Sequence, residues 1–172
     1  AQPCAQHGRP PASIQPAGAR RLAWFVRPIA VSGKISHRAR RGAVKSGSCI
    51  CGAVKFKVSC ELKPPDACHC VQCRKFSGHY SVGTDAPRSA VKITGADNIT
   101  WYHSTAKVRR GFCSICGCSM FFDPPAKDWI GISMGAFDGA TETHTELHIF
   151  VAEKGDYYEI TDGLPQYERI PR

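Results

Sequence analysis

The segment Cys113-Ser-Ile-Cys-Gly117 places two cysteines three residues apart and follows them with a glycine. This spacing is typical of a zinc knuckle, in which a tight turn points two sulfurs at one ion and the glycine tolerates a positive φ. Two further cysteine groups precede it in the chain: Cys49-Ile-Cys51-Gly52 and Cys68-His-Cys-Val-Gln-Cys73. One such pair alone is weak evidence, but three groups between residues 49 and 116 strongly indicate metal binding.

The three groups supply two, three and two sulfurs, which makes seven in all. A structural zinc ion takes four ligands in a closed tetrahedron. The first and third groups together provide such a set: Cys49, Cys51, Cys113 and Cys116. The middle group leaves Cys68, Cys70 and Cys73, and three protein ligands with one open position are typical of a catalytic zinc ion. We therefore predict two zinc ions, one structural and one catalytic.

Other interpretations of the middle group stay open. A fourth ligand would turn it into a second structural site, and the candidates for that ligand are Cys60, Cys118, His79 and His69. A redox disulfide is less favoured, because Cys-x-x-Cys redox motifs usually lie near a βαβ pattern, which this sequence lacks. We interpret the remaining cysteines, Cys4, Cys60 and Cys118, as ordinary thiols, since a buried cysteine behaves as a small hydrophobic residue.

The residues around these groups have a β pattern. Val54, Phe56 and Val58 alternate with two lysines, which predicts a half-buried strand. Similar short runs occur at 79–84, 91–94, 99–103, 108–112, 119–122, 129–134 and 147–151, and turn-forming residues separate them. We expect an all-β fold of short, mainly antiparallel strands, stabilised by zinc. The one candidate for a short helix is His69–Phe76, at the middle cysteine group.

Charge divides the chain into a tail and a body. The net charge of the 172 residues is +9, yet residues 1–45 hold nine Lys or Arg and no Asp or Glu, so the rest is neutral. We expect a basic, disordered tail over 1–45, with a short turn at Leu22–Val26, and one zinc-binding domain over 46–172. The tail fits a targeting segment, a basic arm for nucleic acid, or an extension with no selected role.

The same numbers exclude several classes of protein. The neutral body argues against nucleic acid as its partner, although the tail could bind it. The chain has no run of about 18 apolar residues, so we expect no membrane-spanning helix. Clustered metal-binding thiols require a reducing compartment, so we expect a cytoplasmic protein.

The cysteine blocks in their contexts resemble those of a known family. Gly47-Ser-Cys-Ile-Cys-Gly-Ala-Val54, Cys68-His-Cys-Val-Gln-Cys-Arg-Lys75 and Gly111-Phe-Cys-Ser-Ile-Cys-Gly117 are similar, in that order, to the blocks of the glutathione-dependent formaldehyde-activating enzyme family. The resemblance covers residues 46–171 and does not include the tail. It implies the zinc-bearing β fold known as Mss4-like. It also implies that the first and third blocks hold a structural zinc ion and that the middle block holds a catalytic one.

The family resemblance implies a carbon–sulfur lyase that joins formaldehyde to glutathione, giving S-hydroxymethylglutathione. The partners expected are a small-molecule thiol and an aldehyde. Arg74 and Lys75 could pair with a substrate carboxylate, or could simply be solvated. Alternation along a strand lets at most one of Arg109 and Arg110 face any given site. The competing interpretation is a non-catalytic, zinc-stabilised binding module with a basic N-terminal arm.

Overall fold

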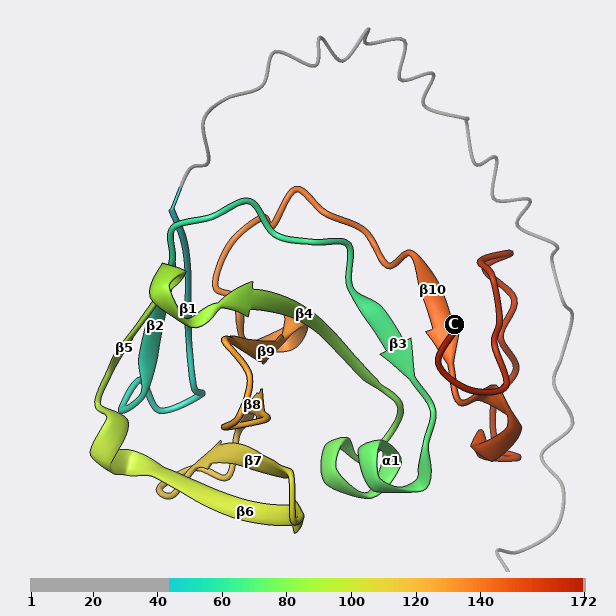
Figure 1. Cartoon of the computed structure of the whole chain (residues 1–172), viewed down its shortest axis with the longest axis horizontal. Helices are drawn as coiled ribbons and strands as arrows, with labels where there is room; N and C mark the ends of the chain where they lie inside the picture. The colour runs from blue at the N-terminus through green and yellow to red at the C-terminus, as the bar shows by residue number, and fades with distance from the viewer. Residues whose placement is uncertain (1–43, 172) are drawn as a thin grey trace, which may run out of the picture. The chain divides into compact units, whose positions relative to one another are not determined.

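A computed structural model describes residues 44–171. The expectations for the tail therefore lie outside the described residues, apart from those for its last two residues, and this includes the turn at Leu22–Val26. The strands of the described part form two sheets, and both lie in the part of the chain shown in colour in Figure 1. Within this part, no helix combines the length and the apolar character that crossing a membrane would require.

The smaller sheet has three antiparallel strands in the order β1 (Lys45–Ser48), β2 (Lys55–Val58) and β5 (Val91–Thr94). Strand β2 alternates as predicted, with Phe56 and Val58 buried and the two lysines exposed. The Phe56 ring packs edge-on against Phe121 and Phe137, at centroid distances of 5.8 and 5.1 Å. These contacts join the small sheet to the large one through a shared hydrophobic core.

The larger sheet has seven strands in the order β10-β3-β4-β9-β8-β7-β6. Their bounds are β3 (Asp66–Cys68), β4 (Ser81–Pro87), β6 (Ile99–Thr105), β7 (Val108–Cys113), β8 (Ser119–Asp123), β9 (Trp129–Ser133) and β10 (Leu147–Ile149). All neighbours pair antiparallel except β10 and β3, which are parallel. The prediction of an all-β fold with mainly antiparallel strands is confirmed.

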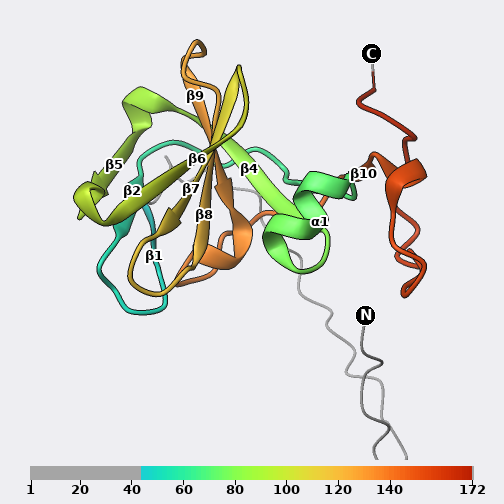
Figure 2. The same ribbon diagram turned by 90° about the horizontal axis from the view of Figure 1, so that it is seen from below.

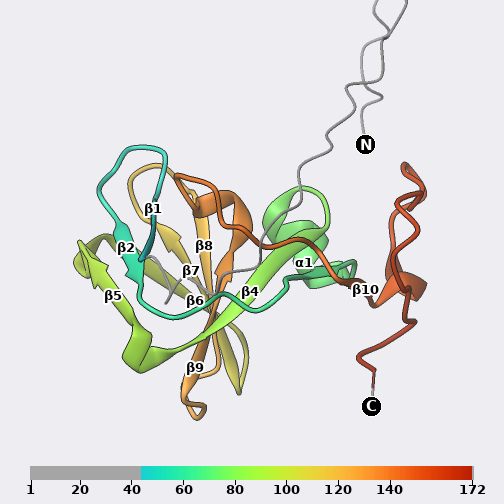
Figure 3. The same cartoon turned by 90° about the horizontal axis from the view of Figure 1, so that it is seen from above.

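The described residues also form four short 3-10 turns: η1 (Arg88–Ala90), η2 (Ala96–Asn98), η3 (Met134–Ala136) and, after the last strand, η4 (Val151–Glu153). Figures 2 and 3 show strands β7 to β9 between the three-stranded sheet on one side and helix α1 (Val71–Ser77) on the other. The segment that follows β10 lies on the helix side in both views. Helix α1, which carries the last cysteine of the middle group, therefore lies across these strands from the three-stranded sheet.

Helix α1 is the one α-helix of the described residues, and it begins later than the predicted start at His69. Cys70 keeps an extended backbone, with φ −61° and ψ 155°, and its sulfur accepts a hydrogen bond from the backbone N–H of Cys73. At the other end Gly78 takes the left-handed conformation, φ 80°, and its N–H bonds the Arg74 carbonyl. The helix thus contains the last cysteine of the middle group.

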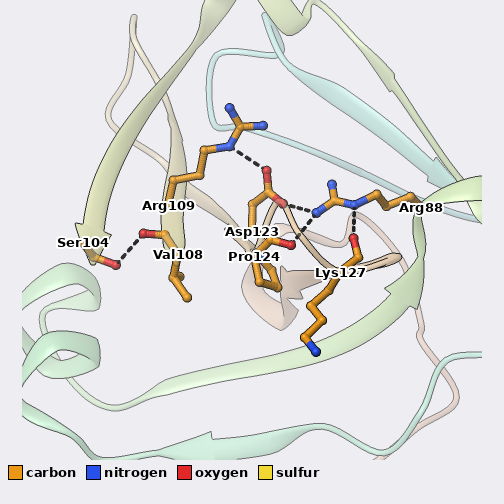
Figure 4. Close-up of polar contacts among 7 residues, drawn as sticks. All are labelled: Arg88, Ser104, Val108, Arg109, Asp123, Pro124 and Lys127. Carbon is orange, nitrogen blue, oxygen red and sulfur yellow. Dashed lines mark hydrogen bonds and ion pairs between the residues drawn. The ribbon is translucent and has the colours of Figure 1, made fainter. Parts of the chain in front are cut away.

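An ion cluster around the buried Asp123 carboxylate joins β7 and β8 to the chain after β4 (Figure 4). The Asp123 carboxylate, whose side chain is 1% exposed, accepts hydrogen bonds from Arg88 and from Arg109, the latter over 2.7 Å. Arg88 also donates to the carbonyls of Pro124 and Lys127. The Arg109 guanidinium lies over the Trp101 ring, 4.3 Å from its centroid. This cluster fixes the strand that carries Arg110 and Cys113.

Candidate metal centres

The first cysteine cluster joins two turns that are about sixty residues apart in the sequence. Cys49 and Cys51 lie between β1 and β2, Cys113 ends β7, and Cys116 lies in the turn between β7 and β8. Each turn closes on a glycine with positive φ, 74° at Gly52 and 71° at Gly117, as a zinc knuckle requires. The Gly52 N–H donates to the Cys49 carbonyl, and the Gly117 N–H donates to the Cys113 carbonyl.

The sulfur geometry of this cluster fits a tetrahedral zinc ion. All four Sγ atoms lie within 4.8 Å of one another, with 3.5 Å between Cys49 and Cys51 and 3.7 Å between Cys51 and Cys113. A tetrahedron with Zn–S distances of about 2.3 Å has edges of about 3.8 Å. A disulfide would require about 2.05 Å. The separations therefore match ligands of one ion and exclude a bond between these neighbours.

Backbone groups prepare this cluster for a cation by stabilising thiolates. The Val54 N–H points at the Cys49 sulfur over 3.3 Å. Backbone N–H groups of Cys118 and Cys51 lower the pKa of the Cys116 thiol to about 6. Hydrogen bonds to the charged form favour that form, and a thiolate is the species that binds zinc. The donor set and its surroundings thus fit a structural zinc site.

The second cluster is the trio Cys68, Cys70 and Cys73, whose sulfurs also lie within 4.8 Å of one another. Cys68 ends β3, Cys70 caps helix α1, and Cys73 lies in its first turn. Hydrogen bonds from the Cys68 and Cys73 thiols lower the pKa of Cys70 to about 2, and the same crowding raises the pKa of Cys68. Three sulfurs that crowd around a shared negative charge form a donor set that a divalent cation fits.

No fourth histidine, cysteine or carboxylate of residues 44–171 joins the trio. Both ring nitrogens of His69 are engaged elsewhere, and His79 Nδ1 lies 3.3 Å from the Tyr157 hydroxyl. Cys60 and Cys118 pack against the hydrophobic core. None of the four candidates for a closing ligand thus joins the sulfurs of the trio, which keeps three protein donors.

A chain of four hydrogen-bonded side chains begins at Tyr158 and passes through two buried histidines, His69 and His148, and sequence reasoning missed it. The Tyr158 hydroxyl lies 2.5 Å from His69 Nδ1, His69 Nε2 lies 2.8 Å from His148 Nδ1, and His148 Nε2 lies 2.8 Å from Asp162. His69 and His148 are 0% and 3% exposed. Burial and the neighbouring His148 lower the pKa of His69 to about 4. This chain ties the backbone between Cys68 and Cys70 to the C-terminal segment.

The two arginines of β7 face different surroundings, as the strand alternation predicts. Arg109 binds Asp123, whereas Arg110 reaches the trio, with its Nη2 3.6 Å from the Cys73 sulfur. The Arg110 side chain is buried, and its guanidinium lies over the rings of Phe76 and Phe122. Of the two helix cations considered from the sequence, Lys75 is exposed and Arg74 is half-buried. The cation shown in contact with a sulfur of the trio thus comes from a strand.

Comparisons with known proteins bear on this cysteine arrangement. Residues 44–153 match the family model described as glutathione-dependent formaldehyde-activating enzyme. A Halomonas elongata protein, provisionally named as a glutathione-dependent formaldehyde-activating enzyme, is 31% identical over 66% of this chain and 79% of its own length. An uncharacterised lyase of Schizosaccharomyces pombe is 23% identical over 70% of this chain and 88% of its own length.

A crystal structure of a Rhodobacter sphaeroides protein is also similar, with 25% identity and a TM-score of 0.48 over 55% of this chain and 89% of that one. The family match includes all seven cysteines of the two clusters, and it ends at Glu153, before Tyr158 and Asp162. Taken with the relative from Halomonas elongata, it shows that this chain belongs to the glutathione-dependent formaldehyde-activating enzyme family.

Proposed function

We propose that this protein is a zinc-dependent carbon–sulfur lyase that acts on thiol–aldehyde adducts, with glutathione and formaldehyde as the pair that gives S-hydroxymethylglutathione. One observation carries the proposal. The trio of Cys68, Cys70 and Cys73 gathers three sulfurs with no fourth protein ligand among the described residues, and a second, separate cluster has four. The family match and the relatives named as enzymes support the same direction.

In this proposal the two clusters hold two ions with different roles. Cys49, Cys51, Cys113 and Cys116 would enclose one zinc ion and stabilise the fold, because metal binding of this kind is coupled to folding. The trio would hold the other. A zinc ion held by three thiolates supplies a position for a substrate thiolate and a positive centre that can polarise a carbonyl.

The chemistry itself is simple to balance. In the forward direction a carbon–sulfur bond forms between the thiol sulfur and the aldehyde carbon, and the thiol proton passes to the carbonyl oxygen; the reverse reaction breaks that bond. The chain's own contribution is to hold the three cysteine sulfurs in position. The capping bond to Cys70 and the buried His69–His148 pair fix the segment that carries the trio. Clustered thiols of this kind stay reduced in the cytoplasm, where we place the protein.

The test is turnover by the full chain loaded with zinc. The rate of exchange between formaldehyde, glutathione and their adduct is measured by exchange NMR and compared with the uncatalysed rate. We expect acceleration by the wild type, its loss in Cys70→Ser, and no change in Cys60→Ser, which removes a thiol that packs on the core. A protein that contains two zinc ions and leaves the exchange at the uncatalysed rate would contradict the proposal.

A further inference from the structure

Arg110 is a buried cation that meets no acidic side chain in the part of the chain that the structure describes. The residue is 6% exposed, and its Nε has no hydrogen-bond partner among the described residues. The ion pairs of residues 44–171 use other cations: Asp123 takes Arg88 and Arg109, and no carboxylate lies within 4.0 Å of the Arg110 guanidinium. A buried charge is costly unless an opposite charge compensates it, so Arg110 requires an anion from another source.

The trio of cysteines is the source that the contacts indicate. Within residues 44–171, apart from its two aromatic neighbours, the guanidinium has one polar contact, from Nη2 to the Cys73 sulfur over 3.6 Å. The rings of Phe76 and Phe122, centred 5.4 and 5.2 Å from its Cζ, hold the planar group in place. A guanidinium stays charged at any physiological pH. Arg110 therefore brings one permanent positive charge to the edge of the trio.

Counting charges shows what this cation would change. A divalent ion with three thiolates carries one net negative charge, and Arg110 cancels it. A thiolate that then enters as the fourth ligand brings the total to one negative charge instead of two. We propose that Arg110 is the counter-cation of the centre formed by Cys68, Cys70 and Cys73, and that it makes the open position favour a thiolate over a neutral ligand. This inference rests on the proposed function, since it takes the trio to hold a divalent ion.

The arrangement assigns this role to Arg110 alone among the cations of its hairpin. Arg109, the preceding residue, is bound to Asp123 and stacked on Trp101. Lys107, at the turn between β6 and β7, is exposed, so water screens its charge. Lys107 is therefore a matched control, because its removal changes the net charge by the same amount without touching the trio.

The test measures ligand binding at cobalt, which replaces zinc in the full chain and reports its fourth ligand by absorption. Two probes are titrated: 2-mercaptoethanol, which binds as a thiolate and releases its proton to the buffer, and imidazole, which binds neutral. We expect Arg110→Met to weaken the binding of 2-mercaptoethanol about tenfold or more, since the loss of a positive charge within a few Å of a thiolate is only partly screened in a site with little water. Imidazole affinity should change less than about threefold, and Arg110→Lys should restore most of the thiol affinity.

Each outcome decides a separate point. If Arg110 had a merely structural role, Arg110→Met would weaken the binding of both probes equally, and that result overturns the inference. The inference is also overturned if Arg110→Met binds 2-mercaptoethanol as tightly as the wild type or as Lys107→Met does. If Arg110→Met does not fold, Arg110→Gln takes its place, and a wild type that prefers imidazole to 2-mercaptoethanol overturns the inference without any variant. A wild type that holds cobalt in the trio but binds no thiol contradicts the proposed function itself.

Discussion

Removal of the negative charge of Asp123 offers the sharpest test of the packing argument. Asp123→Asn keeps the size of the side chain but leaves two guanidinium groups facing a neutral amide (Figure 4). Breaking a buried ion pair by removing one partner costs about 3–5 kcal/mol. The Arg88 and Arg109 side chains are 36% and 32% exposed, so water partly compensates them. We therefore expect the lower end, a loss of about 3 kcal/mol in the free energy of unfolding.

For a domain of this size, about 3 kcal/mol corresponds to a fall of about 10 °C in Tm. The assay is urea and thermal unfolding at pH 7, followed by tryptophan fluorescence, on proteins shown to contain equal zinc. Asp138→Asn is the control, because this exposed carboxylate accepts one hydrogen bond from Ser48, and we expect its effect to stay below about 1 kcal/mol. An Asp123→Asn protein as stable as the control would refute the account of the cluster.

Three further predictions concern single residues. Burial and the nearby Asp66 carboxylate raise the pKa of Asp85, so the ionised Asp85 side chain opposes folding as the pH rises. Asp85→Asn should therefore raise Tm at pH 7, and this gain should disappear below about pH 4. The control Asp97→Asn should show no such pH-dependent gain in Tm. Equal gains at both pH values would refute this. A Cβ at Gly47 would lie 2.1 Å from Phe56 Cζ and 2.2 Å from the Ala136 carbonyl, so Gly47→Ala should lower the free energy of unfolding by about 1–3 kcal/mol, whereas Gly135→Ala, with open space, should not. His148→Ala leaves buried His69 Nε2 unpaired and should cost about 1–3 kcal/mol by urea unfolding, while the exposed His144→Ala should cost almost nothing.

Strands were predictable where apolar and polar residues alternate. The run Val91–Thr94 was placed with its observed bounds, and most others were placed within two or three residues. Strand β1 was missed, because Lys45-Ser-Gly-Ser48 has no apolar face and pairs through its backbone, with Gly47 leaving room for Phe56. Strand β3 was missed because its three residues are too few to show a period.

Within each cysteine group the spacing was informative, because a short turn fixes which sulfurs can meet. Counting four ligands for a closed zinc site then paired the first group with the third, which lies about sixty residues away. Contacts of the other side chains between distant parts of the chain were not predictable. His69 contacts His148 and Tyr158, which are about eighty or more positions away in the sequence, and Arg110 on β7 reaches Cys73 in helix α1. Alternation limits which of two adjacent arginines can face a site, but the tertiary fold decides which one does.

The number of zinc ions per chain tests the central claim most directly. Elemental analysis of the purified protein should give two zinc ions for the wild type and one for Cys70→Ser, which should remain folded, while Cys113→Ser should lose the fold together with its structural ion. A wild type with a single zinc ion that Cys70→Ser retains would contradict the division of the sulfurs into an enclosed site and an open one.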